Sequence, residues 1–205
     1  MGSSLGGLFT LYTLFNNPSV FKNYVLTSPA IQWDKGVINS YMEKFSGNSS
    51  GLTKRLSMAI GGYEDVNSYQ KFVDKLKGKN FPGLKIKSEV IDGVGHSGGK
   101  ADGYTRGLQF AFEKEPIKVA DKILEKYEGD YKSGNGMKVS VKKEGNSLII
   151  GIPTLEEATL YPETEKDFYE IGRYALVHFK IDDNGNVSGF QLEAFANKLE
   201  FQKLK

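Results

Sequence analysis

Near its N-terminus the chain reads Gly2-Ser3-Ser4-Leu5-Gly6-Gly7-Leu8-Phe9. These residues fit the pattern G-x-S-x-G, in which a serine sits on a sharp turn between a strand and a helix. The turn crowds its neighbours, so small residues must flank the serine, and the apolar residues that follow at helical spacing supply the helix. We therefore predict that Ser4 is a nucleophile and that the amide of Leu5 donates to an oxyanion at the positive end of the helix. The alternative is a flexible N-terminal stretch without a catalytic role.

A serine hydroxyl needs a general base, and the chain offers only two histidines. His96 follows a predicted strand over residues 84–91, in the glycine-rich loop Gly93–Gly99, and the carboxyl end of a parallel strand is where a base is expected. His178 lies inside a predicted antiparallel strand, which favours an exposed or half-buried structural residue. We predict that His96 is the base; otherwise it is a loop histidine without a task.

The third member of such a site is an acid that orients the imidazole, and in this fold it comes between the serine and the histidine in chain order. Gly61-Gly62-Tyr63-Glu64-Asp65 directly follows a predicted strand over residues 55–60 and offers two candidates. Glu64 is slightly favoured over Asp65. The carboxylate that does not orient His96 is expected to cap the helix that begins near Val66.

The two halves of the chain have different patterns. Residues 1–118 alternate short apolar strands with helices, which predicts an α/β domain with a mostly parallel sheet. Residues 119–205 contain one short helix, expected over residues 119–127, and then many short strands separated by turn residues, which predicts a small antiparallel β-barrel or sandwich. The strands of the second half are expected at residues 129–132, 138–143, 147–152, 158–162, 167–170, 175–181, 187–194 and 198–203.

Composition excludes several classes of function. The 205 residues include no cysteine, so disulfides, thiol catalysis and thiolate metal sites are ruled out. The net charge of +2 comes from scattered lysines, which gives no reason to expect a nucleic-acid partner. No apolar run approaches the roughly 20 residues of a membrane span, and this chain carries no secretory signal pattern. Neither the compartment nor the oligomeric state follows from these features.

No cofactor or metal is expected. Residues 93–98 also fit G-x-G-x-x-G, but Pro116 and the second half follow where a dinucleotide site would need a further strand ending in an acid. Residues 182–193 resemble a calcium loop, yet Val187 stands where that loop requires glycine, so a hairpin turn is the better interpretation. The aromatic residues of the second half could line a pocket, although such residues more often fill a core.

Four segments together resemble a known family: residues 2–9, Ser28-Pro29-Ala30, residues 61–64 and residues 93–96. The first 115 residues or so are similar to the α/β-hydrolase esterases that include esterase-D-like and enterochelin-esterase-like enzymes. This resemblance implies hydrolysis of a small-molecule carboxylic ester through an acyl-enzyme, with Ser4 as nucleophile and His96 as base and later acid. The second half resembles a lipocalin-like β-barrel domain of unknown function, through residues 127–131 and 160–163.

The sequence departs from the family pattern at its N-terminus, because that family has several strands before the nucleophile and here only Met1 precedes Gly2. We therefore expect the C-terminal half of an α/β-hydrolase, cut from a longer protein, without the strand that holds Ser4. Its activity as an isolated chain is open. The alternative function is a non-catalytic binding or interaction module built on a vestigial hydrolase, and a peptidase of the same fold is a third option.

Overall fold

The computed structural model describes residues 1–46, 52–153, 156–172 and 174–204. The polar loop expected over residues 46–51 lies, after Ser46, outside these residues. The chain divides into two compact units, Met1–Glu113 and Lys114–Lys205, and each is described by itself.

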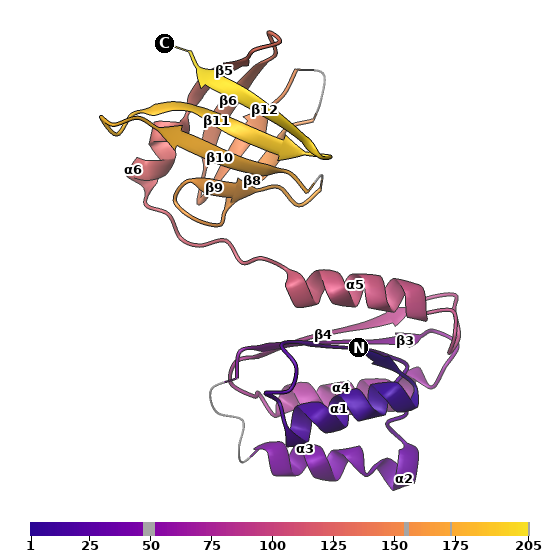
Figure 1. The fold of residues 1–205 in the computed structure, drawn as a ribbon. Helices are drawn as coiled ribbons and strands as arrows, with labels where there is room; N and C mark the ends of the chain where they lie inside the picture. The colour runs from indigo at the N-terminus through magenta and orange to yellow at the C-terminus, as the bar shows by residue number, and fades with distance from the viewer. Residues whose placement is uncertain (47–51, 154–155, 173, 205) are drawn as a thin grey trace. The chain divides into compact units, whose positions relative to one another are not determined.

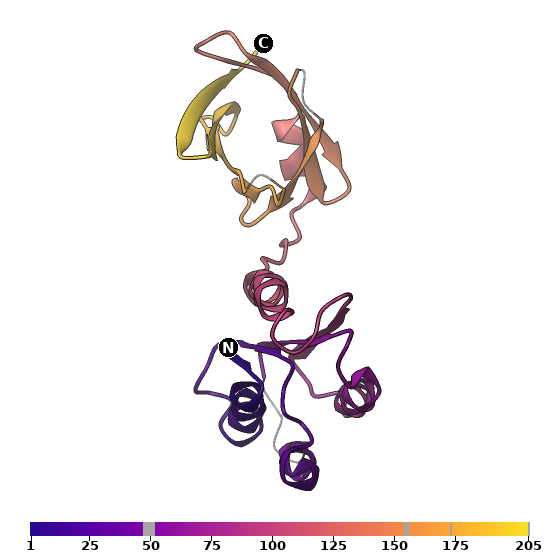
Figure 2. The ribbon, with the colours of Figure 1, turned by 90° about the vertical axis from the view of Figure 1, so that its right-hand side faces the viewer.

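The first unit is built on a parallel sheet of four strands in the order β1-β2-β3-β4. Helices α1, α3 and α4 cover one face of this sheet, and α5 covers the other (Figures 1 and 2). The strands are β1 (Gly2–Ser3), β2 (Tyr24–Thr27), β3 (Lys54–Gly61) and β4 (Leu84–Ile91). The helices are α1 (Leu5–Asn16), α2 (Trp33–Gly36), α3 (Ile38–Ser46), α4 (Val66–Gly78) and α5 (Lys100–Phe112).

The strand that leads into Ser4 is present, which corrects the expectation that it would be missing. Gly2 and Ser3 form β1, which pairs in parallel with β2 through Gly2 opposite Leu26 and Ser3 opposite Thr27. Two residues have no periodicity for sequence analysis to detect, and only their pairing with a longer strand defines them.

One hydrophobic core lies between the sheet and the helices α1, α3 and α4. Apolar residues at helical spacing face it, and the strands add their inward side chains. Its largest fully buried members include Leu11, Leu14, Tyr24, Leu26, Ile38 and Tyr69.

The second unit is a closed antiparallel barrel in which consecutive strands pair and β12 closes the ring against β5 (Figure 2). Alternating apolar and polar residues place every second side chain inside. The strands are β5 (Gly129–Ser133), β6 (Lys138–Glu144), β7 (Ser147–Gly151), β8 (Ala158–Pro162), β9 (Asp167–Tyr169), β10 (Leu176–Ile181), β11 (Val187–Ala194) and β12 (Asn197–Lys203).

Aromatic side chains fill the barrel. Tyr127 stacks on Phe179 with ring centroids 4.0 Å apart, and Phe190 stacks on Phe201 at 4.7 Å. Both tyrosines of the core keep a partner for their hydroxyl groups: Tyr127 donates to the carbonyl of Glu165, and Tyr131 donates to that of Tyr127. These aromatics form the core of the barrel, the more common of the two roles considered for them.

The helix expected over residues 119–127 is split into α6 (Asp121–Leu124) and a 3-10 turn, η1 (Glu125–Tyr127). The compact units divide between Glu113 and Lys114, whereas the sequence pattern placed the domain boundary after Lys118. The intervening residues group with the barrel because the amide of Ile117 donates to the carbonyl of Pro162. The predicted fold class, a parallel α/β sheet followed by a small antiparallel barrel, is confirmed.

Candidate active site

The candidate site residues follow three of the four parallel strands. Ser4 comes directly after β1, Glu64 and Asp65 come shortly after β3, and His96 comes after β4. Because the strands are parallel, their carboxyl ends meet at one edge of the sheet, where α/β proteins bind ligands.

Ser4 has the strained backbone expected of a nucleophile on a sharp turn. Its φ of 55° and ψ of −121° lie outside the regions that residues with a side chain readily adopt. Two hydrogen bonds hold this conformation: the amide of Ser4 donates to the carbonyl of Thr27 at 3.2 Å, and the amide of Ala30 donates to the carbonyl of Ser4 at 3.0 Å. Leu5 is the first residue of α1, so its amide has no acceptor within the helix.

The glycines of the elbow are required by close packing. A Cβ atom on Gly2 would lie 2.2 Å from the carbonyl oxygen of Gly6, and one on Gly7 would lie 3.0 Å from Cα of Pro29. A larger residue at Gly2 would push the turn and helix α1 apart. Small residues are therefore required at both positions of the turn.

His96 pairs with Glu64. Its Nδ1 lies 2.6 Å from Oε2 of Glu64, and the histidine side chain is 50% exposed while the glutamate is 16% exposed. The other carboxylate oxygen, Oε1, accepts hydrogen bonds from Ser28 Oγ at 2.6 Å and from the amide of Gly61 at 2.8 Å. Burial favours a raised pKa for Glu64, but the hydrogen bonds from Ser28, His96 and Gly61 outweigh it and hold this pKa below its usual value.

Asp65, the other candidate acid, has a different task. Its Oδ1 accepts the amide of Ser68 at 3.0 Å and so caps α4, while its Oδ2 accepts Nε2 of Gln32 at 2.8 Å. The hydrogen bonds from Ser68 and then Gln32 lower the pKa of Asp65. The structure thus brings Glu64, and not Asp65, to His96.

The loop that carries His96 leans over the end of β3. The amide of Tyr63 donates to the carbonyl of Val94 at 3.0 Å, and a Cβ atom on Gly61 would lie 2.6 Å from that same carbonyl oxygen. Within the described residues no hydrogen bond joins Ser4 to His96. In serine hydrolases such bonds are often long before a substrate binds and tighten in the complex with it.

A cavity of about 280 Å³ adjoins the pair of Glu64 and His96. Its wall includes the apolar side chains of Ile31, Ile60 and Trp33, of which Trp33 is 59% exposed. A mostly apolar pocket next to a histidine and a carboxylate is suited to the organic part of a small ligand.

Ser28 belongs to this site although sequence analysis did not select it as a site residue. Two signals were available: Ser28 directly follows the apolar residues 24–27, which are expected to form a strand, and Ser28-Pro29-Ala30 is one of the segments that resemble the esterase family. Serines at strand ends are common, and only the folded structure brings Ser28 to Glu64.

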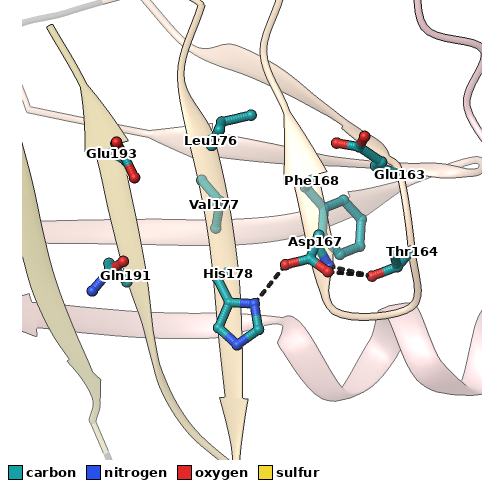
Figure 3. Close-up of a pocket in the computed structure, with 9 residues that line it drawn as sticks. All are labelled: Glu163, Thr164, Asp167, Phe168, Leu176, Val177, His178, Gln191 and Glu193. Carbon is teal, nitrogen blue, oxygen red and sulfur yellow. Dashed lines mark hydrogen bonds and ion pairs between the residues drawn. The ribbon is translucent and has the colours of Figure 1, made fainter. Parts of the chain in front are cut away.

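The second histidine lies on the outer wall of the barrel. His178 Nδ1 lies 2.5 Å from Oδ1 of Asp167, whose Oδ2 accepts Thr164 Oγ1 at 2.6 Å, as Figure 3 shows. The histidine side chain is 54% exposed. This triplet has the same chemistry as Ser28, Glu64 and His96, yet it follows no strained serine and lies in the other unit.

Neither a metal cluster nor a membrane helix is found in the part of the chain that the structure describes. No three histidine, aspartate or glutamate side chains there are arranged to hold a metal ion. None of the described helices has the length and apolar character needed to cross a membrane.

Comparison with known proteins finds a curated relative and a matching family model. The ferri-bacillibactin esterase BesA of Bacillus subtilis is 27% identical over 126 residues, which make up 56% of this chain and 42% of that enzyme. That enzyme is described as an esterase that acts on ferri-bacillibactin. Residues 113–205 match a family described as a domain of unknown function (DUF3471). The resemblance inferred from the sequence motifs is thereby confirmed at this level.

Two solved structures are also similar to the chain. The BES protein of Bacillus cereus is 26% identical with a TM-score of 0.49, over 54% of this chain and 43% of that one. The siderophore hydrolase EstB of Aspergillus nidulans is 24% identical with a TM-score of 0.43, over 58% of this chain and 50% of that one. The chain spans about half or less of the length of these relatives.

Proposed function

We propose that this chain carries the nucleophile, acid and base of a serine hydrolase that cleaves carboxylic esters. The observation that carries the proposal is the 2.6 Å contact between Glu64 and His96, at the same sheet edge as the strained Ser4. Chain order supports it too, since serine, acid and histidine follow one another as this fold requires. The names of the relatives of the first unit agree with ester hydrolysis.

Each residue has one role in the proposed reaction. Oγ of Ser4 attacks the ester carbonyl carbon while Nε2 of His96 accepts the hydroxyl proton. Glu64 holds Nδ1 of His96 and stabilises the imidazolium, for which it must stay ionised; its lowered pKa favours this. The amide of Leu5 donates to the oxyanion.

The leaving alcohol then takes the proton from His96 as the carbonyl re-forms, which leaves an acyl group on Ser4. A water molecule gives its proton to His96 and attacks this acyl-enzyme, and the acid product leaves when Ser4 regains its proton. No cofactor or metal enters these steps.

The substrate class that we propose is a small carboxylic ester. The cavity lined by Ile31, Ile60 and Trp33 would take an apolar or aromatic part of it. Because related enzymes are described as siderophore hydrolases, a ferri-siderophore ester is the first natural substrate to examine beside simple aryl esters.

The experiment is turnover of a short acyl p-nitrophenyl ester by the chain and two serine variants. Ser4→Ala is expected to lower kcat at least about 1,000-fold. Ser3→Ala is the matched control, because Ser3 is the adjacent serine and its buried Oγ has no hydrogen-bond partner within the described residues. Equal turnover by the wild-type chain and Ser4→Ala would reject Ser4 as the nucleophile, and no turnover by the wild-type chain would favour the non-catalytic module.

A further inference from the structure

We infer that the Ser28 hydroxyl is a positioning group, which fixes the Glu64 carboxylate so that one of its oxygens faces His96. The inference rests on the proposed function, because it assigns a further role within the same site. Ser28 does not touch the reacting atoms in this account; it acts through Glu64.

The two oxygens of Glu64 have separate tasks. Oε1 accepts Ser28 Oγ at 2.6 Å and the amide of Gly61 at 2.8 Å, which leaves Oε2 for His96 at 2.6 Å. A glutamate side chain turns about three bonds, and a single contact to His96 would not fix its carboxylate plane. The two donors on Oε1 hold this plane from the side opposite the histidine.

Ser28 is buried and strained, which is unusual for a serine in a loop. It is only 4% exposed, and its φ of 43° lies in the left-handed region that favours glycine. Its amide donates to the carbonyl of Ala59 on β3 at 2.7 Å and keeps the residue in this conformation. Strained backbones that their surroundings maintain are concentrated at functional sites.

The segment Ser28-Pro29-Ala30 also reaches the nucleophile. Its last residue, Ala30, donates an amide hydrogen bond to the carbonyl of Ser4 at 3.0 Å. Its first residue holds Glu64. This short loop after β2 therefore links the elbow of Ser4 to the acid that orients His96, and it sets the spacing between them.

A purely structural role is the competing explanation, in which the Ser28 hydroxyl only satisfies a buried carboxylate. The two explanations differ in their effect on catalysis: loss of a positioning group lowers kcat and shifts its pH dependence, whereas loss of a purely structural group lowers only the stability of the fold. The hydrogen bond from Ser28 stabilises the ionised form of Glu64, so removal of the hydroxyl should raise the pKa of Glu64. The coupled pair of Glu64 and His96 should then bind its shared proton more tightly.

The test compares Ser28→Ala and Ser28→Gly with the wild-type chain in ester turnover across pH. Both variants lose the hydroxyl, and glycine also relieves the strain at φ 43°, so at least one should fold. We expect kcat to fall about 10-fold with KM changed less than about twofold. The acid limb of kcat/KM, which reports protonation of the Glu64–His96 pair, should move to higher pH in both variants.

Thr164→Ala is the matched control, because Thr164 donates to a carboxylate that also pairs with a histidine, but on the barrel (Figure 3). It should leave kcat and the acid limb unchanged. An unchanged acid limb in both Ser28 variants of an active chain would overturn the inference.

Failure of the proposed function would look different, since the wild-type chain itself would then show no turnover. In that case the imidazole resonances of His96 are followed by NMR against pH, with His178→Gln used to assign the two histidines. The titration of the Glu64–His96 pair should still move to higher pH in Ser28→Ala. No movement would reject the positioning role of Ser28.

Discussion

Ser4 has a backbone conformation that only its surroundings maintain. A residue with φ 55° and ψ −121° stores strain of about 1–3 kcal/mol, which the hydrogen bonds to Thr27 and Ala30 and the tight packing of Gly2 against Gly6 must offset. The G-x-S-x-G pattern predicts this turn because a larger residue at its small positions would clash with neighbouring atoms. At this position the sequence was sufficient for the local structure.

The acid was open between two neighbours, and the choice can be tested. Glu64→Gln should lower kcat at least about 100-fold, because the amide cannot hold His96 in the same way. Asp65→Asn should leave both kcat and the thermal stability nearly unchanged, because the side-chain oxygen of asparagine can accept the same amide of Ser68 and cap α4. Ester turnover and thermal unfolding of both variants provide the measurement. Loss of activity in Asp65→Asn alone would reverse the assignment.

Sequence could not make this choice, because Glu64 and Asp65 are adjacent and both follow the same strand. If the loop were shifted by one residue, Asp65 would face the histidine and Glu64 would face the helix. Ser28 was missed for a related reason. Its contact with Glu64 joins residues that are 36 positions apart, and no local sequence pattern predicts such a contact.

Among the elements, α5 depends on two glycines that allow it to lie directly on the sheet. Cβ atoms on Gly103 and Gly107 would lie 2.6 Å from Thr27 Cγ2 and 2.3 Å from Val25 Cγ1. Gly107→Ala should therefore lower the free energy of unfolding of the first unit by about 1–3 kcal/mol. Urea denaturation followed by the helical circular-dichroism signal, which comes mainly from the first unit, measures it.

Gly78→Ala provides the control, because Gly78 also lies in a helix but has open space around its Cα. That variant should be as stable as the wild type or slightly more stable. Equal stability of Gly107→Ala and the wild type would show that α5 does not need this close approach.

The contact between Asp167 and His178 joins strands β9 and β10. Hydrogen bonds from His178 and Thr164 lower the pKa of Asp167, so its contribution to stability is present above its ordinary value of 3.8 and is lost as the pH falls through the lower folded value. Asp167→Asn should therefore speed hydrogen exchange of the β9 and β10 amides at neutral pH, and this difference should shrink as the pH falls below the ordinary pKa of 3.8.

Asp183→Asn, in the turn after β10, is the control for general loss of charge. A difference between Asp167→Asn and the wild type that stays constant from neutral to acid pH would contradict the ionic origin of this contribution.

Strands were the elements that sequence predicted best. In the barrel, alternation and turn residues such as Glu144-Gly145-Asn146 set the ends of β6 and β7 to within a residue or so. The exceptions have physical causes. The strand β1 is too short to show a period. The helix α6 passes into a 3-10 turn, where the side chain of Tyr127 is buried in the barrel core.

For the whole molecule, the sequence pattern separated an α/β half from a β half, and both are present. Each unit has a core of its own, which is why local patterns were enough to recognise them. The alignment with BesA covers 42% of the length of that enzyme. The activity of BesA is therefore not assigned to this chain, whose own activity has to be measured. The proposed function depends on Ser4 acting as a nucleophile.

Covalent capture tests this claim most directly. The intact chain is incubated with a fluorophosphonate, and the mass increase is located by peptide mapping. We predict one adduct, on Ser4, which does not form in Ser4→Ala, forms much more slowly in His96→Gln and forms at the wild-type rate in His178→Gln. A wild-type chain that forms no adduct, or forms it equally fast without His96, would contradict the account.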